Sequence, residues 1–278
     1  RSPSRGLGDV YKRQILDSGQ IYLTGIQALV RLAIMQAKRD SKLGLNTAGF
    51  ITGYRGSPLG ALDQQLFQAG HILKEQNIRF LPAVNEELAA TSIWGAQQAE
   101  LQGRGRYDGV YCLWYGKGPG VDRSGDAFRH GNLAGSSPNG GVLVVRGDDH
   151  TAESSTTVHQ SEFGMVNVLI PVLNPAGVRD VIEFGLFGWM LSRYSGCWVG
   201  LKCVHDTIES SASISISEEI TRVRVPHDFT IPPDGLNIRA NDGFLEQEER
   251  LHRFKLPAVH AFVRANKLDR ICLLYTSD

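Results

Sequence analysis

Two short segments of the chain carry residues whose types and spacing could do chemistry. Residues 53–60 (GYRGSPLG) follow an apolar run, and Asn85, Glu86 and Glu87 follow a second apolar run further along. Glycines let a backbone approach a ligand closely, and a carboxyl group can exchange a proton with a ring nitrogen. Together the two segments suit the binding of an aromatic heterocycle that is contacted by an acid.

Glu86 has two interpretations. In the first, Asn85 is a helix N-cap, and Glu86 and Glu87 form an acidic first turn that interacts favourably with the helix dipole. In the second, the Glu86 carboxyl is buried between subunits or domains, where it could hold or share a proton and drive the tautomerisation of an aminopyrimidine. Acids at helix starts are common, so the pattern alone favours the first interpretation.

The glycine-containing loop also fits two roles. Ser57 could be the N-cap of a helix with Pro58 as its first residue, which would make the loop a plain strand-to-helix turn. The same loop could bind a ligand through Tyr54, Arg55, Gly56 and Ser57, with the Ser57 hydroxyl reaching a substrate or a cofactor ring. It is not a Walker loop, because no Gly-Lys-Ser/Thr follows.

Two further loops contain polar groups. Lys117 lies among Gly116, Gly118 and Gly120, which suits either anion binding or a rigid connection with a solvated lysine. Residues 146–162 include His150, but their spacing matches no recognised set of metal ligands, so we expect a solvated loop and no metal site. Lys117 and His150 are further candidates for substrate contacts.

Alternating patterns of strand and helix position these loops. Strands are expected at residues 48–53, 78–84, 109–115, 141–145, 168–173 and 197–204, and helices at 25–38, 59–74, 86–101 and from about residues 122 and 175. This alternation predicts an α/β fold with a mainly parallel sheet and helices on both faces. Ligands bind at the carboxyl ends of such strands, where residues 54–57 and 85–87 should lie.

Composition excludes several classes of partner. The 278 residues contain 29 Lys+Arg and 29 Asp+Glu, so the net charge is zero and neither a nucleic acid nor an anionic membrane is expected to bind. The 4 cysteines have no metal-ligand spacing, and most lie in apolar runs, which favours a reducing compartment such as the cytoplasm. No apolar run has the length of about 20 residues that spans a bilayer.

Changes in the sequence pattern divide the chain into four expected regions. Residues 1–14 and 271–278 resemble translated adapter or assembly-junction sequence, and we expect both to be non-native flanks. Residues 15–209 should form the main domain. From about residue 210 the texture changes to SSASISIS, a turn and a charged helix at 243–267, so we expect residues 210–270 to be a linker or the start of a next region.

The motifs taken together resemble the fused indolepyruvate ferredoxin oxidoreductases, which are thiamine-dependent 2-oxoacid:ferredoxin oxidoreductases. The strings that carry the resemblance are LTGIQALVRL (23–32), GLNTAGFITGYRGSPLGALD (44–63), NEELAAT (85–91), WYGKGPGVDRSGDAFRHGNLAG (114–135) and RGDDHTAESSTTVHQSE (146–162). The resemblance covers residues 15–270. It implies that residues 15–209 are the pyrimidine-binding domain of the thiamine diphosphate fold.

The resemblance also implies roles for individual residues. Glu86 matches the acid that hydrogen-bonds N1′ of thiamine diphosphate, which then loses its C2 proton and attacks the 2-oxoacid. Ser57 matches a hydroxyl residue near the substrate in related pyruvate enzymes, and Tyr54, Arg55 and Gly56 belong to the same loop. Glu87 is the alternative acid if the register differs by one residue.

The resemblance implies further parts that this sequence lacks. The 4Fe–4S clusters that pass electrons to ferredoxin, the Mg²⁺ and diphosphate half-site, and the coenzyme A acceptor site would lie elsewhere in a larger protein, expected to be a homodimer. The chain alone should therefore be inactive. A related enzyme with another 2-oxoacid specificity, and a non-catalytic oligomerisation or regulatory module with the same fold, remain alternatives.

Overall fold

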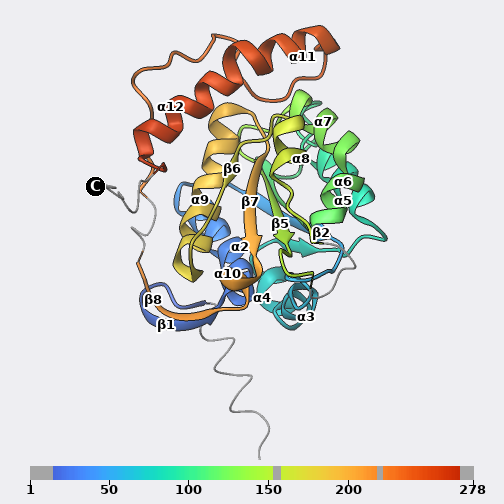
Figure 1. The fold of residues 1–278 in the computed structure, drawn as a ribbon. Coiled ribbons are helices and arrows are strands. Elements are labelled where there is room, and N and C mark those ends of the chain that lie inside the picture. Colours follow the sequence, from blue (N-terminus) through green and yellow to red (C-terminus); the bar gives the residue numbers. More distant parts are fainter. Residues whose placement is uncertain (1–14, 153–157, 218–221, 270–278) are drawn as a thin grey trace, which may run out of the picture.

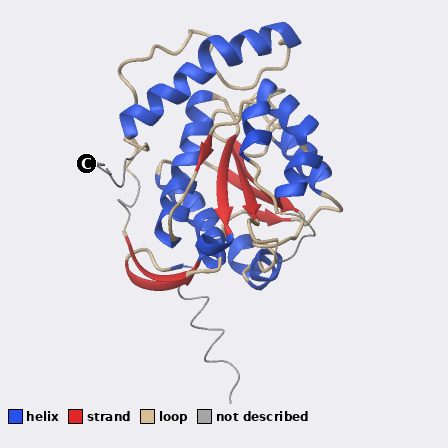
Figure 2. Cartoon of the chain, viewed as in Figure 1, coloured by secondary structure: helices blue, strands red, loops and turns tan. Residues whose placement is uncertain are grey.

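A six-stranded parallel sheet forms the centre of the protein. The computed structural model describes residues 15–152, 158–217 and 222–269, so both expected non-native flanks lie outside the described residues. The strand order is β3-β2-β4-β5-β7-β6, with helices on both faces (Figures 1 and 2), which confirms the predicted α/β class. The strands are β2 (Thr47–Gly53), β3 (Ile78–Phe80), β4 (Gly109–Lys117), β5 (Val142–Asp148), β6 (Val172–Leu173) and β7 (Val199–Val204).

Each face of the sheet has its own apolar core. Along β4, Tyr111 and Leu113 join the core beneath α2 and α9, whereas Cys112 and Trp114 join the core beneath α5 and α7. Successive strand side chains point to opposite faces, so a strand covered on both sides is apolar throughout. The main covering helices are α2 (Gly25–Lys42), α9 (Val178–Ser195), α5 (Glu86–Ala96), α6 (Gly118–Arg123) and α7 (Gly125–Ala134).

Several predicted elements are shorter than expected. The strand predicted at residues 78–84 ends at Phe80, although the Leu81 and Ala83 amides still bond to β2. The strand predicted at 168–173 is reduced to β6, which follows Pro171. The helix predicted at 59–74 divides into two, and other short helices follow: α3 (Leu62–Gln68), α4 (Gly70–Glu75), α8 (Glu162–Asn167) and α10 (His205–Ile208).

The segment expected to be a linker packs against the main domain. β8 (Ser211–Ile216) pairs antiparallel with β1 (Gly19–Thr24), a strand that the sequence patterns did not reveal. Ile214 and Ile216 are buried while the serines between them are exposed, so the SASISI alternation marks a half-buried strand. Further on, α11 (Phe244–Arg250), a π-helical turn (Leu251–Lys255) and α12 (Leu256–Asn266) follow, and α12 packs on α9. Where a domain boundary lies stays a prediction.

A buried ion pair joins elements at the amino-terminal edge of the sheet. The Arg193 guanidinium donates two hydrogen bonds of 2.7 Å to the Asp40 carboxylate. Gln36 and Thr47 donate to the same carboxylate at 2.8 and 2.7 Å. Arg193 also donates through Nε to the Gly140 carbonyl at 2.9 Å. The cluster thereby ties the ends of α2 and α9 to the start of β2 and to the turn before β5.

Lys255 fastens the carboxyl-terminal helices to the main domain. Its side chain is fully buried, and Nζ donates to the Leu133 carbonyl at 3.0 Å in the last turn of α7. Burial lowers the pKa of Lys255 from its ordinary 10.5 to about 8. Lysine at a helix carboxyl end satisfies carbonyls that have no partner within the helix.

This lowered pKa predicts a pH dependence of stability. Between about pH 8 and 10.5 the unfolded chain holds a proton that folded Lys255 has released, so the free energy of unfolding should rise with pH in this window. At 1.36 kcal/mol per pKa unit, the rise attributable to Lys255 is about 3 kcal/mol. Urea unfolding of wild type and Lys255→Met at pH 7.5, 9 and 10 isolates this contribution, because titration of other groups is common to both. The difference, wild type minus variant, should become more positive with pH; a constant difference would contradict the assignment.

Among the described residues, none of the helices combines the length and the hydropathy needed to cross a bilayer.

Candidate active site

Three loops meet at the carboxyl end of the sheet, the end at which α10 follows β7 at the bottom of Figure 1. The Tyr54 amide donates to the Tyr115 carbonyl at 3.0 Å, and the Ala83 amide donates to the Gly53 carbonyl at 3.0 Å. These bonds continue the sheet beyond β2 and β3. They place the loop after β2 between the loop that leads to α5 and the end of β4.

Glu86 is the first residue of α5 and is buried. Its relative exposure is 8%, whereas Glu87 is exposed. The Asn85 side chain accepts a hydrogen bond from the Leu88 amide at 2.9 Å, and the Trp114 indole donates to the Glu86 carbonyl at 2.9 Å. Asn85 is therefore an N-cap, and Glu86 is nonetheless a buried acid. Both interpretations of this residue apply at the same time.

Three alternate glycines, one at the end of β4 and two in α6, permit close contacts. A Cβ at Gly120 would lie 2.5 Å from Glu86 Cγ and 2.8 Å from Oε1, so the carboxyl group rests directly on the α6 backbone. A Cβ at Gly118 would lie 2.0 Å from His159 Nδ1, and one at Gly116 would lie 2.5 Å from the Trp114 ring. Each of these positions therefore excludes a side chain.

The Glu86 carboxylate has no hydrogen-bond or ion-pair partner within residues 15–152, 158–217 and 222–269. Within these residues the carboxylate is unpaired yet reachable, because neither of its oxygens is among the fully buried atoms without a partner. It is therefore suited to accept or donate a hydrogen bond to a ligand that enters beside α6. The polar nitrogen of a heterocycle fits this requirement.

The loop of residues 54–57 lies beside Lys117. A Cβ at Gly56 would lie 2.7 Å from Lys117 Cδ, so the lysine stem passes over the loop backbone. Tyr54 is 41% exposed, and Arg55 is exposed too. The N-cap expected at Ser57 is wrong, because the next helix begins at Leu62. Ser57 thus stays a candidate ligand contact without a capping role.

The solvated loop expected at residues 146–162 is only partly found. His150 is exposed, but Arg146 and Asp148 are fully buried and joined at 3.0 Å. Ser161 donates to Asp148 through Oγ at 2.6 Å, and Lys202 on β7 forms an ion pair with Glu162. The sequence pattern did not indicate this network, because its members lie on different helices and strands. Among the described residues, no group of His, Cys, Asp or Glu could hold a metal ion.

Sequence reasoning assigned no separate role to His159. Its Nε2 lies 2.8 Å from Asp122 Oδ2 on α6. Its ring rests on Gly118, two residues before the glycine that contacts Glu86. Only the presence of a histidine in a motif-rich segment could have drawn attention to it, since the partner carboxylate is distant in sequence.

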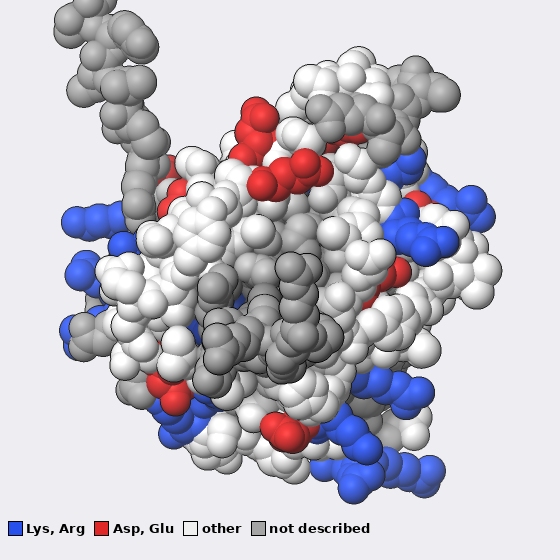
Figure 3. Space-filling view, turned by 90° about the horizontal axis from the view of Figure 1, so that it is seen from below, with Lys and Arg blue, Asp and Glu red and all other residues white. Residues whose placement is uncertain are grey.

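The surface around Glu86 exposes apolar side chains. Val84 is 82% exposed and Leu88 53%. Figure 3 views this end of the molecule, where Lys and Arg lie toward the rim, Asp and Glu form several small patches, and uncharged residues lie between them.

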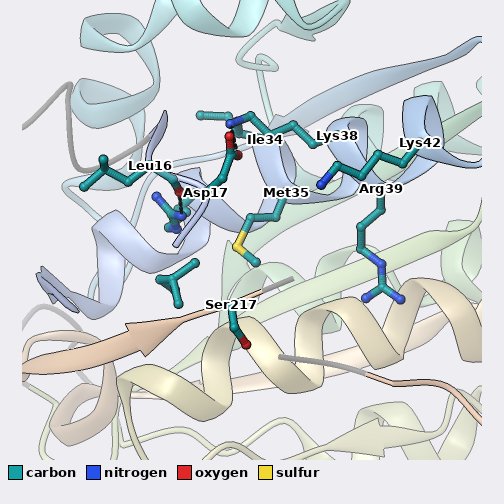
Figure 4. A pocket seen from close by; sticks show the side chains of 10 residues that line it. Leu16, Asp17, Ile34, Met35, Lys38, Arg39, Lys42 and Ser217 are labelled. Atoms are coloured by element: carbon teal, nitrogen blue, oxygen red, sulfur yellow. Dashed lines mark hydrogen bonds and ion pairs between the residues drawn. The ribbon is translucent and has the colours of Figure 1, made fainter. Parts of the chain in front are cut away.

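A separate cavity lies beside the outer side of α2, and Figure 4 shows it at close range. Ile34 and Met35 line it together with Lys38, Arg39 and Lys42, and Ser217 lies across from them. The residues lining this cavity belong to none of the three loops at the carboxyl end of the sheet, so we do not assign it to the candidate site.

Comparison with known proteins supports the fold. No protein-family profile and no curated protein matches the chain. Among solved structures, it is similar to the 2-oxoglutarate:ferredoxin oxidoreductase from Magnetococcus marinus, with a TM-score of 0.62 and 15% sequence identity. The two chains share a fold. The match covers 88% of this chain and 45% of that oxidoreductase chain, which was determined with 2-oxoglutarate, coenzyme A and succinyl-CoA bound.

Proposed function

We propose that this chain is the pyrimidine-binding part of a thiamine-diphosphate-dependent 2-oxoacid:ferredoxin oxidoreductase. The observation that carries the proposal is Glu86. It is a buried carboxylate with no partner among the described residues, at the carboxyl edge of a parallel sheet, in a fold shared with a 2-oxoglutarate:ferredoxin oxidoreductase. The motif strings quoted above support indolepyruvate as the substrate.

The residues present fit the aminopyrimidine half of thiamine diphosphate. When bound, this cofactor supplies the nucleophilic carbon and the electron sink for decarboxylation of a 2-oxoacid. Glu86 would hold the proton that is shared with the ring nitrogen, while Gly120 lets the carboxyl group rest close against α6. The loop of Tyr54, Arg55, Gly56 and Ser57 would line the adjoining side, with Ser57 offering its hydroxyl to the substrate.

The remaining parts of the reaction would come from outside this chain. Mg²⁺ with the diphosphate half-site, the 4Fe–4S clusters and coenzyme A belong to this proposal as components of a larger, dimeric parent protein. Ferredoxin would be the electron acceptor. The partly apolar surface beside Glu86, at Val84 and Leu88, would be covered in that assembly.

The parent protein tests the proposal directly. Reduction of ferredoxin should require thiamine diphosphate, coenzyme A and a 2-oxoacid, with indolepyruvate preferred over pyruvate and 2-oxoglutarate. A preference for another 2-oxoacid would retain the reaction class and reject the indolepyruvate assignment. No activity with any 2-oxoacid, together with no binding of thiamine diphosphate, would favour the non-catalytic module.

The chain by itself should bind the cofactor weakly. It offers the pyrimidine half-site, whereas the diphosphate contributes much of the affinity through charged contacts in the missing half. Isothermal titration calorimetry of the isolated chain with thiamine diphosphate and Mg²⁺ should therefore show no micromolar binding. Micromolar affinity would mean that the described residues form a more complete site than we propose.

A further inference from the structure

The first turn of α6 is held between two side chains. His159 Nδ1 would lie 2.0 Å from a Cβ at Gly118, and Glu86 Cγ would lie 2.5 Å from a Cβ at Gly120. Each group therefore touches the helix backbone with no side chain between. A displacement of the His159 ring would be passed through this turn to the acid.

His159 is tied to the same helix that it contacts. Nε2 lies 2.8 Å from Asp122 Oδ2, and the His159 amide donates to the Asp149 carbonyl at 3.2 Å. Because a carboxylate can only accept, Nε2 is the nitrogen that donates. Nδ1 is buried against Gly118 and has no hydrogen-bond partner in the described part of the chain. The ring is fixed on one side by Asp122 and on the other by the helix backbone.

The backbone beside His159 is anchored in turn to the sheet. Ser161 donates to Asp148 through both its hydroxyl, at 2.6 Å, and its amide, at 3.2 Å. Asp148 is fully buried and paired with Arg146, which is fully buried as well. A network of this kind rigidifies the segment that bears it. A continuous set of contacts thus leads from the end of β5 through His159 and α6 to Glu86.

We propose that His159 is a positioning residue that, together with Asp122, holds α6 against Glu86 and so fixes the acid for its ligand. The expected effect of His159 on catalysis rests on the proposed function, since it assumes that Glu86 contacts the cofactor. The expected effect of His159 on the position of Glu86 does not depend on that function. The alternative is that the His159–Asp122 pair merely anchors a loop.

Glycine substitutions give a sharp test in the parent protein. Gly118→Ala would force the His159 ring aside, and His159→Ala would remove the ring. Each should lower the rate of thiamine diphosphate C2 proton exchange about tenfold or more, because displacements of about 1 Å can cost that much. In the double variant the clash is absent, so its rate should equal that of His159→Ala alone. His260→Ala, which removes an exposed histidine on α12, is the control and should exchange at the wild-type rate.

A readout without cofactor separates this inference from the proposed function. The Trp114 indole donates to the Glu86 carbonyl, so the Trp114 Nε1–H resonance in the ¹⁵N-labelled apoprotein reports the position of Glu86. His159→Ala, Asp122→Ala and Gly118→Ala should each shift this resonance, and His260→Ala should not.

The possible outcomes have distinct meanings. A shifted Trp114 resonance in a protein whose wild type neither binds thiamine diphosphate nor exchanges its C2 proton would uphold the positioning role and reject the proposed function. An unshifted resonance with wild-type exchange in folded His159→Ala would overturn the positioning role and leave the proposed function intact. Circular dichroism of each variant establishes that it is folded.

Discussion

Replacing Glu86 by glutamine is expected to lower the rate of cofactor C2 proton exchange about 10²–10⁴-fold in the parent protein. Glutamine keeps the shape and the hydrogen-bonding capacity of the side chain, but its amide cannot hold the proton shared with a ring nitrogen. Exchange is followed by NMR in deuterated buffer with bound thiamine diphosphate. The steady-state reduction of ferredoxin should fall in parallel.

Folding should survive this substitution. No described residue pairs with the Glu86 carboxylate, so the variant breaks no hydrogen bond or ion pair within the described structure. The free energy of unfolding in urea should therefore change little, and it should rise if the carboxylate is costly to bury. Cofactor affinity should fall less than the exchange rate, because the amide can still contact the ring.

Glu87→Gln is the matched control. Glu87 lies one position later on α5 and is exposed. The variant should retain wild-type exchange. If Glu87→Gln loses C2 proton exchange and Glu86→Gln does not, Glu87 is the acid that contacts the cofactor. If neither variant loses exchange, Glu86 has only a structural role and the proposed function loses its main support.

The largest effect on stability is expected from Asp40→Asn. The Asp40 carboxylate accepts hydrogen bonds from Arg193, Gln36 and Thr47, and it is 1% exposed. An asparagine amide would present N–H groups to donors and would leave the Arg193 guanidinium buried without its counter-charge. Breaking a buried pair by removing one partner costs about 3–5 kcal/mol of unfolding free energy.

An exposed ion pair provides the comparison. Glu249 pairs with Arg253 at 2.5 Å, and the two side chains are 56% and 68% exposed. Glu249→Gln should change the free energy of unfolding by less than about 1 kcal/mol, since solvent screens such pairs. Urea unfolding monitored by tryptophan fluorescence measures both variants. An Asp40→Asn effect as small as that of Glu249→Gln would show that the buried cluster does not hold these elements together.

Local sequence patterns were enough to predict much of the fold. The runs at residues 109–115 and 141–145 are apolar at every position because both faces of β4 and β5 are covered, and such runs are recognisable without tertiary information. The SASISI alternation was assigned to a linker and not to a strand, because its partner strand β1 lies far away in sequence. Pairing over that separation depends on the position of α2 and α9, which no local pattern specifies.

The candidate site was predictable to a lesser degree. Glu86 could be named because an acid follows an N-cap after an apolar run, but the backbone against which it packs is that of Gly120 in α6. Asp148 and Arg146 were expected in solvent, but they are buried on β5 inside the sheet, and Ser161 hydrogen-bonds Asp148. The positioning role of His159 depends on its contact with Asp122, which no sequence pattern indicated. Contacts between loops are set by the sheet that carries them, and a sequence pattern does not encode their distances.

The alternate glycines at 116, 118 and 120 have a consequence for finding distant relatives. Three different neighbours, Trp114, His159 and Glu86, would each have to move to admit a β-carbon at one of these positions, so the restriction has three separate causes. Drift that erases overall identity should leave this every-second-residue signature in place. A profile weighted on Gly-x-Gly-x-Gly after a buried aromatic strand, with an acid opening the preceding helix, should recover homologues that whole-chain scoring overlooks.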